Sequence, residues 1–265
     1  MHVQKKEVLI YTDFPSKTLS IDYIIGHLER YRLKVSHKGN IYENLSIKGD
    51  SSFELAKRIS GRIIDDIDIP FDRLRDSTNE EINSELDRLS GERSYSGVYY
   101  EGNWLQRIYY NLLAENQSTD RPTDTINIIF TARLFLTYEN RRYHARVILM
   151  GVPNIISTSG IVEAPARPKE YYWLKAGFIK EGKDIRELDK IYRGRFIEYD
   201  DSRITPVLSA YALQAVFYEL TGDPFCDNPS CCLHNSHWQE EVLKAQLEGN
   251  LCEEHRDIFL RFGEM

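Results

Sequence analysis

The sequence lacks the long apolar run that a membrane-spanning helix requires, because no stretch of its 265 residues approaches roughly 18 consecutive apolar residues. It also lacks the pattern of a secretory signal, since polar residues return directly after Val8–Tyr11. We therefore expect a cytoplasmic protein that makes no use of a membrane.

Basic residues are in the minority. Lys and Arg number 34 against 41 Asp and Glu, which gives a formal net charge of −7. A chain with this balance is a poor partner for phosphate backbones, so no nucleic-acid partner is expected. With 42% hydrophobic and 28% charged residues, the composition excludes a disordered or collagen-like chain and is typical of a globular protein.

Hydrophobic periodicity predicts one α/β domain over residues 1–265, because no internal repeat and no clear linker divides the chain. No Gly-x-Gly-x-x-Gly follows the first predicted strand, so a dinucleotide site is not indicated. Strands are predicted at 7–13, 33–37, 125–138, 143–151 and 155–162. Helices are predicted at 21–31, 53–65, 77–89, 103–113, 203–220, 238–248 and 253–262. The helix that starts near Thr78 is mostly polar and is expected on the surface, and residues 163–195 are expected to be irregular.

Cysteine is scarce, and its distribution is informative. The four cysteines all lie between positions 226 and 252. Cys226-x4-Cys231 is followed by 20 residues and then by Cys252-x2-His255, so that two local pairs provide the four N or S ligands of a tetrahedral zinc. A closed set of four ligands would make this ion structural. Cys232 could replace Cys231, and four reduced, buried cysteines without a metal are the alternative.

Two further histidines lie in the segment 222–238, which contains Cys226 and Cys231 and is called the zinc loop below. His234 and His237 do not belong to the predicted set of four ligands. His237 and Glu241 would lie one turn apart on a helix, where they could share a second ion. The alternative is a pair of hydrogen-bonding histidines beside the zinc loop.

A predicted strand also carries cationic and proton-binding side chains. Arg142, His144 and Arg146 alternate and therefore share one face, where they could hold a carboxylate or phosphate. The alternative is an edge strand protected by charge. The turn 157–160 could bind an anion through its backbone amides, but hydroxyl-rich turns are common in proteins without a ligand.

The C-terminal part resembles the archaemetzincins, a family with one catalytic and one structural zinc. The stretch Gly222-Asp-Pro-Phe-Cys226-Asp-Asn-Pro-Ser-Cys231-Cys-Leu233, followed by Leu251-Cys252-Glu-Glu-His255, is similar to their structural-zinc segment. In this resemblance His255 replaces a fourth cysteine, and Leu233 stands at the Met-turn methionine. The resemblance implies a metzincin-like α/β/α domain with a central mixed sheet and a C-terminal zinc-binding subregion at residues 222–262.

The catalytic half of the archaemetzincin pattern does not carry over. Ala215, Glu219 and Phe225 stand at the positions of the three zinc-binding histidines, and Val216 stands at the general-base glutamate. The chain is also similar to a group of archaeal proteins described as metallopeptidases, around residues 143–146, 157–160, 163–168 and 237–240.

These observations predict a protein with one structural zinc and a degenerate catalytic site, which acts as a pseudopeptidase or binding protein for a protein or peptide partner. The alternative is a metallopeptidase or other hydrolase with a displaced second metal site. Its candidate residues are His144, Arg146, Glu219, His234, His237 and Glu241.

Overall fold

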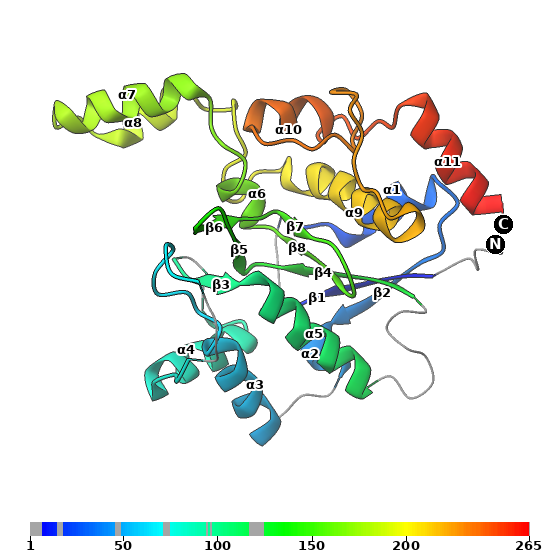
Figure 1. Ribbon diagram of the computed structural model, residues 1–265, viewed down its shortest axis with the longest axis horizontal. Coiled ribbons are helices and arrows are strands. Elements are labelled where there is room, and N and C mark those ends of the chain that lie inside the picture. The colour runs from blue at the N-terminus through cyan, green and yellow to red at the C-terminus, as the bar shows by residue number, and fades with distance from the viewer. Residues whose placement is uncertain are drawn as a thin grey trace.

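A five-stranded mixed sheet lies at the centre of the molecule (Figure 1). The computed structural model describes residues 7–14, 18–45, 49–70, 75–93, 95, 97–116 and 125–264. The strand order is β2-β1-β4-β8-β7, in which neighbouring strands are parallel except for β7 and β8. The strands are β1 (Val8–Thr12), β2 (Val35–Asn40), β4 (Ile126–Thr131), β7 (Ile148–Leu149) and β8 (Asn154–Ser157). The predicted α/β class with a central mixed sheet is confirmed.

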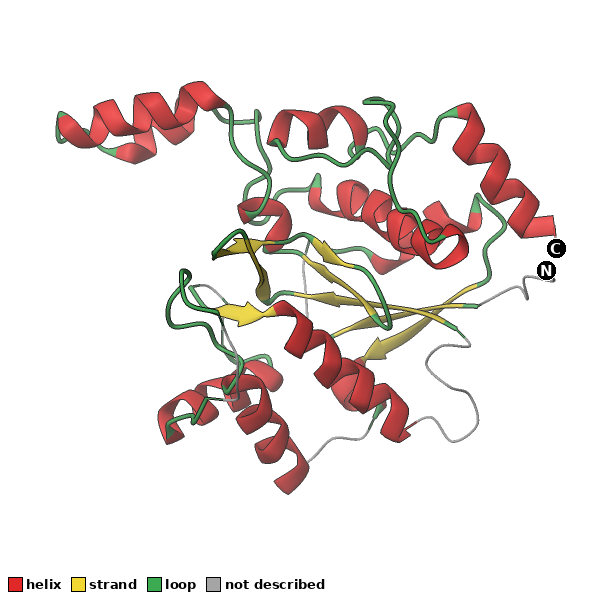
Figure 2. Cartoon of the chain, viewed as in Figure 1, coloured by secondary structure: helices red, strands yellow, loops and turns green. Residues whose placement is uncertain are grey.

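Helices cover both faces of this sheet, as Figure 2 shows. On one face lie α1 (Ile21–Glu29) and α9 (Ile204–Thr221), and on the other lie α2 (Ile41–Asn44), α3 (Asp50–Ser60) and α5 (Gly102–Asn116). Alternation along β1 explains the two layers, because Val8 and Ile10 pack in the core with α9 whereas Leu9 packs in the core with α5. Helix α9 is buried on nearly all sides and ends at Gly222, whose φ of 81° is the left-handed conformation that glycine favours.

The predicted strand 125–138 is two strands in two different sheets, so this prediction is wrong in its extent. Strand β4 ends at Thr131, and β5 (Leu134–Glu139) pairs instead with β3 (Tyr99–Glu101) and β6 (Arg142–Ala145) in a second, three-stranded sheet. The chain turns between β4 and β5 because Ser159 and Ser157 hydroxyls donate to the carbonyls of Ala132 and Arg133. The predicted strand 143–151 divides in the same way into β6 and β7. The predicted strand 155–162 ends at Ser157, where the chain leads into α6 (Gly160–Glu163).

Residues 163–195 are largely helical, which corrects the expectation of an irregular segment. Helices α7 (Lys169–Lys180) and α8 (Ile185–Ile191) form a hairpin that projects from the body of the molecule (Figure 1). They pack around a small core of their own, made of Tyr171, Leu188, Tyr192 and Phe196. The remaining apolar side chains of α7 are largely exposed, and this obscures the helical pattern in the sequence.

Helix α4 (Asn79–Leu89) starts with a capping box between Thr78 and Glu81. It lies at the surface as expected, with Glu80 and Asp87 exposed, but its inner face buries the charged side chains of Glu85 and Arg88. The last two helices, α10 (Gln239–Ala245) and α11 (Glu253–Glu264), agree with the predicted ones. No helix in the described ranges has both the length and the apolar character needed to cross a bilayer.

Candidate metal centre and adjoining cavity

Four side chains from the C-terminal part meet in one cluster. Cys226 and Cys231 lie in the loop after α9, Cys252 precedes α11, and His255 lies in the first turn of α11. One ligand atom from each residue lies within 4.8 Å of all the others. The Sγ atoms of Cys226 and Cys252 are 3.9 Å apart. Two thiolates on a tetrahedral zinc are separated by about 3.8 Å, given Zn–S bonds of about 2.3 Å. The donor set and its spacing therefore fit zinc.

The structure brings Cys231, rather than Cys232, to this cluster. Hydrogen bonds from the Cys232 thiol and the Cys252 backbone N–H lower the pKa of Cys231 to about 5. Burial raises the pKa of Cys226 to about 12, so its thiolate requires a nearby cation. Because zinc binds thiolates, loading the site must displace at least the Cys226 proton.

Two buried glutamines hold the zinc loop against α9. The Nε2 atom of Gln214 donates to the carbonyls of Cys232 and His234 at 3.3 and 3.2 Å. The Nε2 atom of Gln246 donates to the same two carbonyls at 3.2 and 2.7 Å. Leu233, between these carbonyls, is fully buried in the main core. The carbonyls of Cys232 and His234 are therefore held from two helical regions.

A cavity of about 150 Å³ adjoins this loop. Its walls come from the 145–148 segment, the end of α6, α9 and the zinc loop, and they include Arg146, Ile148, Tyr211, Gln214, Phe225, Ser236 and His237. Within the described residues, Gln214 Oε1 and Ser236 Oγ are buried without a hydrogen-bond partner. Two of the residues that line the cavity thus each hold a polar atom without a partner.

The residues proposed for a second ion have other partners. The Nδ1 atom of His234 lies 3.2 Å from the carbonyl oxygen of Cys226. The Glu241 carboxylate accepts from the backbone N–H groups of His237 and Trp238, at 2.7 and 3.1 Å, and thereby caps α10. Across the described ranges, the Cys3His cluster is the one group of three or more His, Cys, Asp or Glu side chains close enough to share an ion.

The remaining candidates have other partners as well. Glu219 accepts from Asn154 Nδ2 at 3.5 Å, and His144 Nε2 lies 3.2 Å from the Glu139 carbonyl. The Arg146 guanidinium pairs with the Glu139 carboxylate at 2.6 Å. Neither Glu219 nor His144 lines the cavity, whereas Arg146 does.

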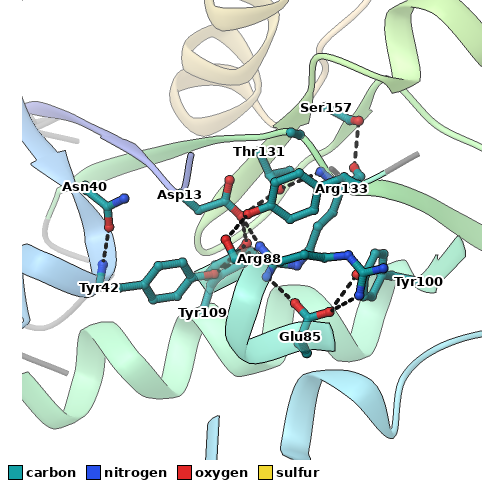
Figure 3. A network of polar contacts seen from close by, with 12 residues as sticks. Asp13, Asn40, Tyr42, Glu85, Arg88, Tyr100, Tyr109, Thr131, Arg133 and Ser157 are labelled. Carbon is teal, nitrogen blue, oxygen red and sulfur yellow. Dashed lines mark hydrogen bonds and ion pairs between the residues drawn. The ribbon is translucent and has the colours of Figure 1, made fainter. Parts of the chain in front are cut away.

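Sequence reasoning missed a buried polar network, shown in Figure 3. The Arg133 guanidinium pairs with Asp13 and Glu85, and all three side chains are fully buried. Burial alone would lower the pKa of Arg133, but the surrounding groups, Glu85 among them, hold it well above its ordinary value. The other members are Tyr42, Arg88, Tyr100, Tyr109 and Thr131.

A signal for this network was present in the sequence. Asp13 directly follows the apolar strand β1. Arg133 follows β4 with one residue, Ala132, in between. The carboxyl ends of adjacent parallel strands lie together, so two opposite charges at these positions predict a contact. The burial of Glu85 carried no comparable signal.

The fold and the site define a mixed α/β protein with a closed Cys3His centre next to a cavity. The chain belongs to the family described as "Probable metallopeptidase family (DUF6775)", whose model matches residues 4–262. This match confirms the resemblance to metallopeptidases.

Two solved structures are similar to the chain over almost its whole length. One is archaemetzincin from Methanopyrus kandleri, with 10% identity, coverage of 98% of this chain and 97% of that chain, and a TM-score of 0.45. The other is a zinc-dependent peptidase from Methanocorpusculum labreanum, with 12% identity, coverage of 96% and 99%, and a TM-score of 0.44. No curated protein matches the chain.

Proposed function

We propose that the protein is a zinc-stabilised, non-catalytic member of its family that binds an extended peptide in the cavity beside β7. The observation that carries the proposal is the nature of the side chains at the positions of the archaemetzincin zinc ligands and general base. Ala215 and Val216 are fully buried in the main core, and Phe225 is a wall of the cavity. Alanine, valine and phenylalanine have no atom that binds zinc or activates water. Glu219, at the remaining ligand position, accepts from Asn154 and does not line the cavity, so a single carboxylate is left of the set.

The free edge of the sheet supports peptide binding. Strand β7 is the last strand of the five-stranded sheet, and it borders the cavity through Ile148. An edge strand offers unpaired backbone N–H and C=O groups, to which an extended peptide can add as a further strand. A cavity of about 150 Å³ has room for one peptide side chain. A side chain with a hydrogen-bond donor would satisfy Gln214 Oε1.

The zinc would act on the shape of this site and not on a reaction. Four protein ligands leave no open coordination position, so the ion would fix the loop that forms one wall of the cavity. We also propose a cytoplasmic location, because the four cysteines are free and a reducing compartment keeps thiol ligands available. The acidic net charge of −7 supports a peptide partner over a nucleic acid.

Metal content per chain tests the structural role of zinc. We expect one zinc in the parent protein, no zinc in Cys252→Ser, and one zinc in both His234→Ala and His237→Ala. Two ions per chain, one of which depends on His234 or His237, would support the hydrolase alternative. The position of both histidines on the cavity wall favours that alternative. A peptidase assay on the same samples would then be expected to show cleavage that a chelator abolishes.

Selection from a peptide library tests the binding role. Phe225→Glu should abolish binding of the selected peptides, because it places a charge in the cavity wall. Phe53→Glu is the matched control, since Phe53 on α3 is exposed to 41% and Phe225 to 40%. Equal binding by both variants would place the peptide elsewhere.

A further inference from the structure

The hairpin of α7 and α8 is a rigid arm, which we define as residues 167–195. Its own small core holds the two helices together, and Asp189 receives hydrogen bonds from Arg167 and Tyr171 at 3.1 and 2.7 Å. At the base, Arg195 pairs with Glu240 of α10 at 2.7 Å. Helix α7 has 12 residues and so extends about 18 Å, clear of the sheet layers (Figure 1).

This arm exposes large apolar side chains. Trp173 is 75% exposed, Ile179 is 60% exposed and Ile191 is 67% exposed. On α7 the spacing of Tyr172, Ala176 and Ile179 places them on one side, away from the buried Tyr171. An exposed apolar surface on a self-packed element marks a contact with another molecule.

The arm is also basic, within an acidic chain. It contains nine Lys and Arg against five Asp and Glu, whereas the whole chain has 34 against 41. Ion pairs of the arm use Arg167, Lys183, Arg186 and Arg195. Five cations of the arm form no ion pair with the described residues, namely Lys169, Lys175, Lys180, Lys190 and Arg193.

A surface of complementary character lies on the 65–69 loop, which reads Asp65-Asp-Ile-Asp-Ile69. Ile67 and Ile69 are exposed between the aspartates, and Ile69 is exposed to 62%. The loop is fixed to the second sheet, because the carbonyls of Ile67 and Asp68 accept from Tyr143 N and Tyr138 Oη. That sheet lies at the same end of the molecule as the arm in Figure 1.

We propose that the arm of one molecule docks on the 65–69 loop of a second copy, and that the reciprocal contact closes a two-fold dimer. The arm brings apolar side chains flanked by cations, and the 65–69 loop brings apolar side chains flanked by carboxylates. Electrostatic attraction and burial of apolar surface would therefore both favour the contact. Five of the arm's nine cations form no ion pair with the described residues of their own chain. They are therefore available to a partner. In a two-fold dimer each contact occurs twice, which doubles the effect of any substitution.

Sedimentation equilibrium with a charge swap tests this proposal. The parent should dimerise, with an affinity that falls as salt rises. Lys175→Glu with Lys180→Glu, or Asp65→Lys with Asp68→Lys, should each weaken dimerisation about tenfold or more, because exposed attractive pairs become repulsive. The chain with both pairs reversed should dimerise again. Trp173→Ala should weaken the dimer without any change of charge.

The control pair Lys38→Glu and Arg256→Glu shifts the net charge equally at exposed positions away from the arm, and it should leave dimerisation unchanged. All variants lie on the surface and should melt as the parent does. A monomeric parent, a dimer insensitive to either reversal, or a failure of the swapped chain to dimerise would overturn the proposal. A monomeric parent that sediments with phosphatidylglycerol vesicles would overturn it too, and would assign the arm to a lipid surface.

Discussion

Replacement of Arg133 by methionine should destabilise the fold more than any surface substitution. The guanidinium neutralises Asp13 and Glu85, whose side chains are fully buried on either side of it. Removal of one partner from a buried ion pair costs about 3 to 5 kcal/mol, because a desolvated charge is left unpaired. Methionine retains most of the apolar volume, so the loss reports the charge and not a cavity.

The remaining contacts decide where in this range the loss falls. Asp13 keeps hydrogen bonds from Tyr109 and Thr131, at 2.5 and 2.7 Å. Glu85 keeps one from Tyr100 at 2.8 Å and its ion pair with Arg88 at 3.2 Å. These donors solvate the carboxylates in part, so we expect a loss of about 3 kcal/mol, near the lower limit. Urea denaturation measures it as a lower midpoint at an unchanged slope.

Two controls separate charge from packing. Arg146→Met breaks the exposed pair with Glu139 and should cost less than about 1 kcal/mol. The double variant Asp13→Asn, Arg133→Met should recover part of the lost stability, because Glu85 keeps its ion pair with Arg88 and no buried carboxylate is then left without a cation. A loss below about 1 kcal/mol for Arg133→Met, or a double variant less stable than the single one, would refute this reasoning.

Three further predictions follow from the structure. Cys252→Ser, or treatment of the parent with a chelator, should lower the free energy of unfolding by several kcal/mol, measured by denaturation with and without added zinc. Burial lowers the pKa of His27 from 6.5 to about 4. The contribution of His27 to the free energy of unfolding is therefore complete above pH 6.5 and is lost as pH falls toward 4. His27→Leu should remove about 2 kcal/mol of this pH dependence of stability, after allowance for solvent screening. A Cβ on Gly160 would lie 2.2 Å from the Arg146 carbonyl oxygen, so Gly160→Ala should lower stability by about 1 to 3 kcal/mol, whereas Gly26→Ala, with open space around it, should not. A Gly160→Ala protein that melts with the parent would contradict this packing.

The Cys3His cluster could be predicted from the sequence because its two pairs are local. Cys252 and His255 are three residues apart at the start of one helix, and sequence spacing alone brings them together. The choice between Cys231 and Cys232 could not be made in this way. It depends on the orientation of a loop that Gln214 and Gln246 hold through long-range hydrogen bonds.

The central sheet was predictable for a different reason. Three of its strands, β1, β4 and β8, are largely apolar runs buried on both faces, and this pattern has few alternatives. The division of the 125–138 run was not predictable, because the carbonyls of Ala132 and Arg133 accept hydrogen bonds from Ser159 and Ser157, which lie far along the chain. Likewise, Glu85 on the polar helix α4 is buried against Arg133 and Tyr100 on other elements, which the pattern of the helix does not reveal.

The Cys3His cluster and the cavity share one loop. Cys226 and Cys231 begin and close the turn that positions Phe225 on one side and His234 on the other, and both of these residues line the cavity. Loss of an ion from the cluster would loosen this wall, whereas a substitution on the wall itself changes only the side chain that the wall presents. In the proposed function, peptide binding in the cavity therefore depends on the zinc, whether or not the protein hydrolyses a substrate.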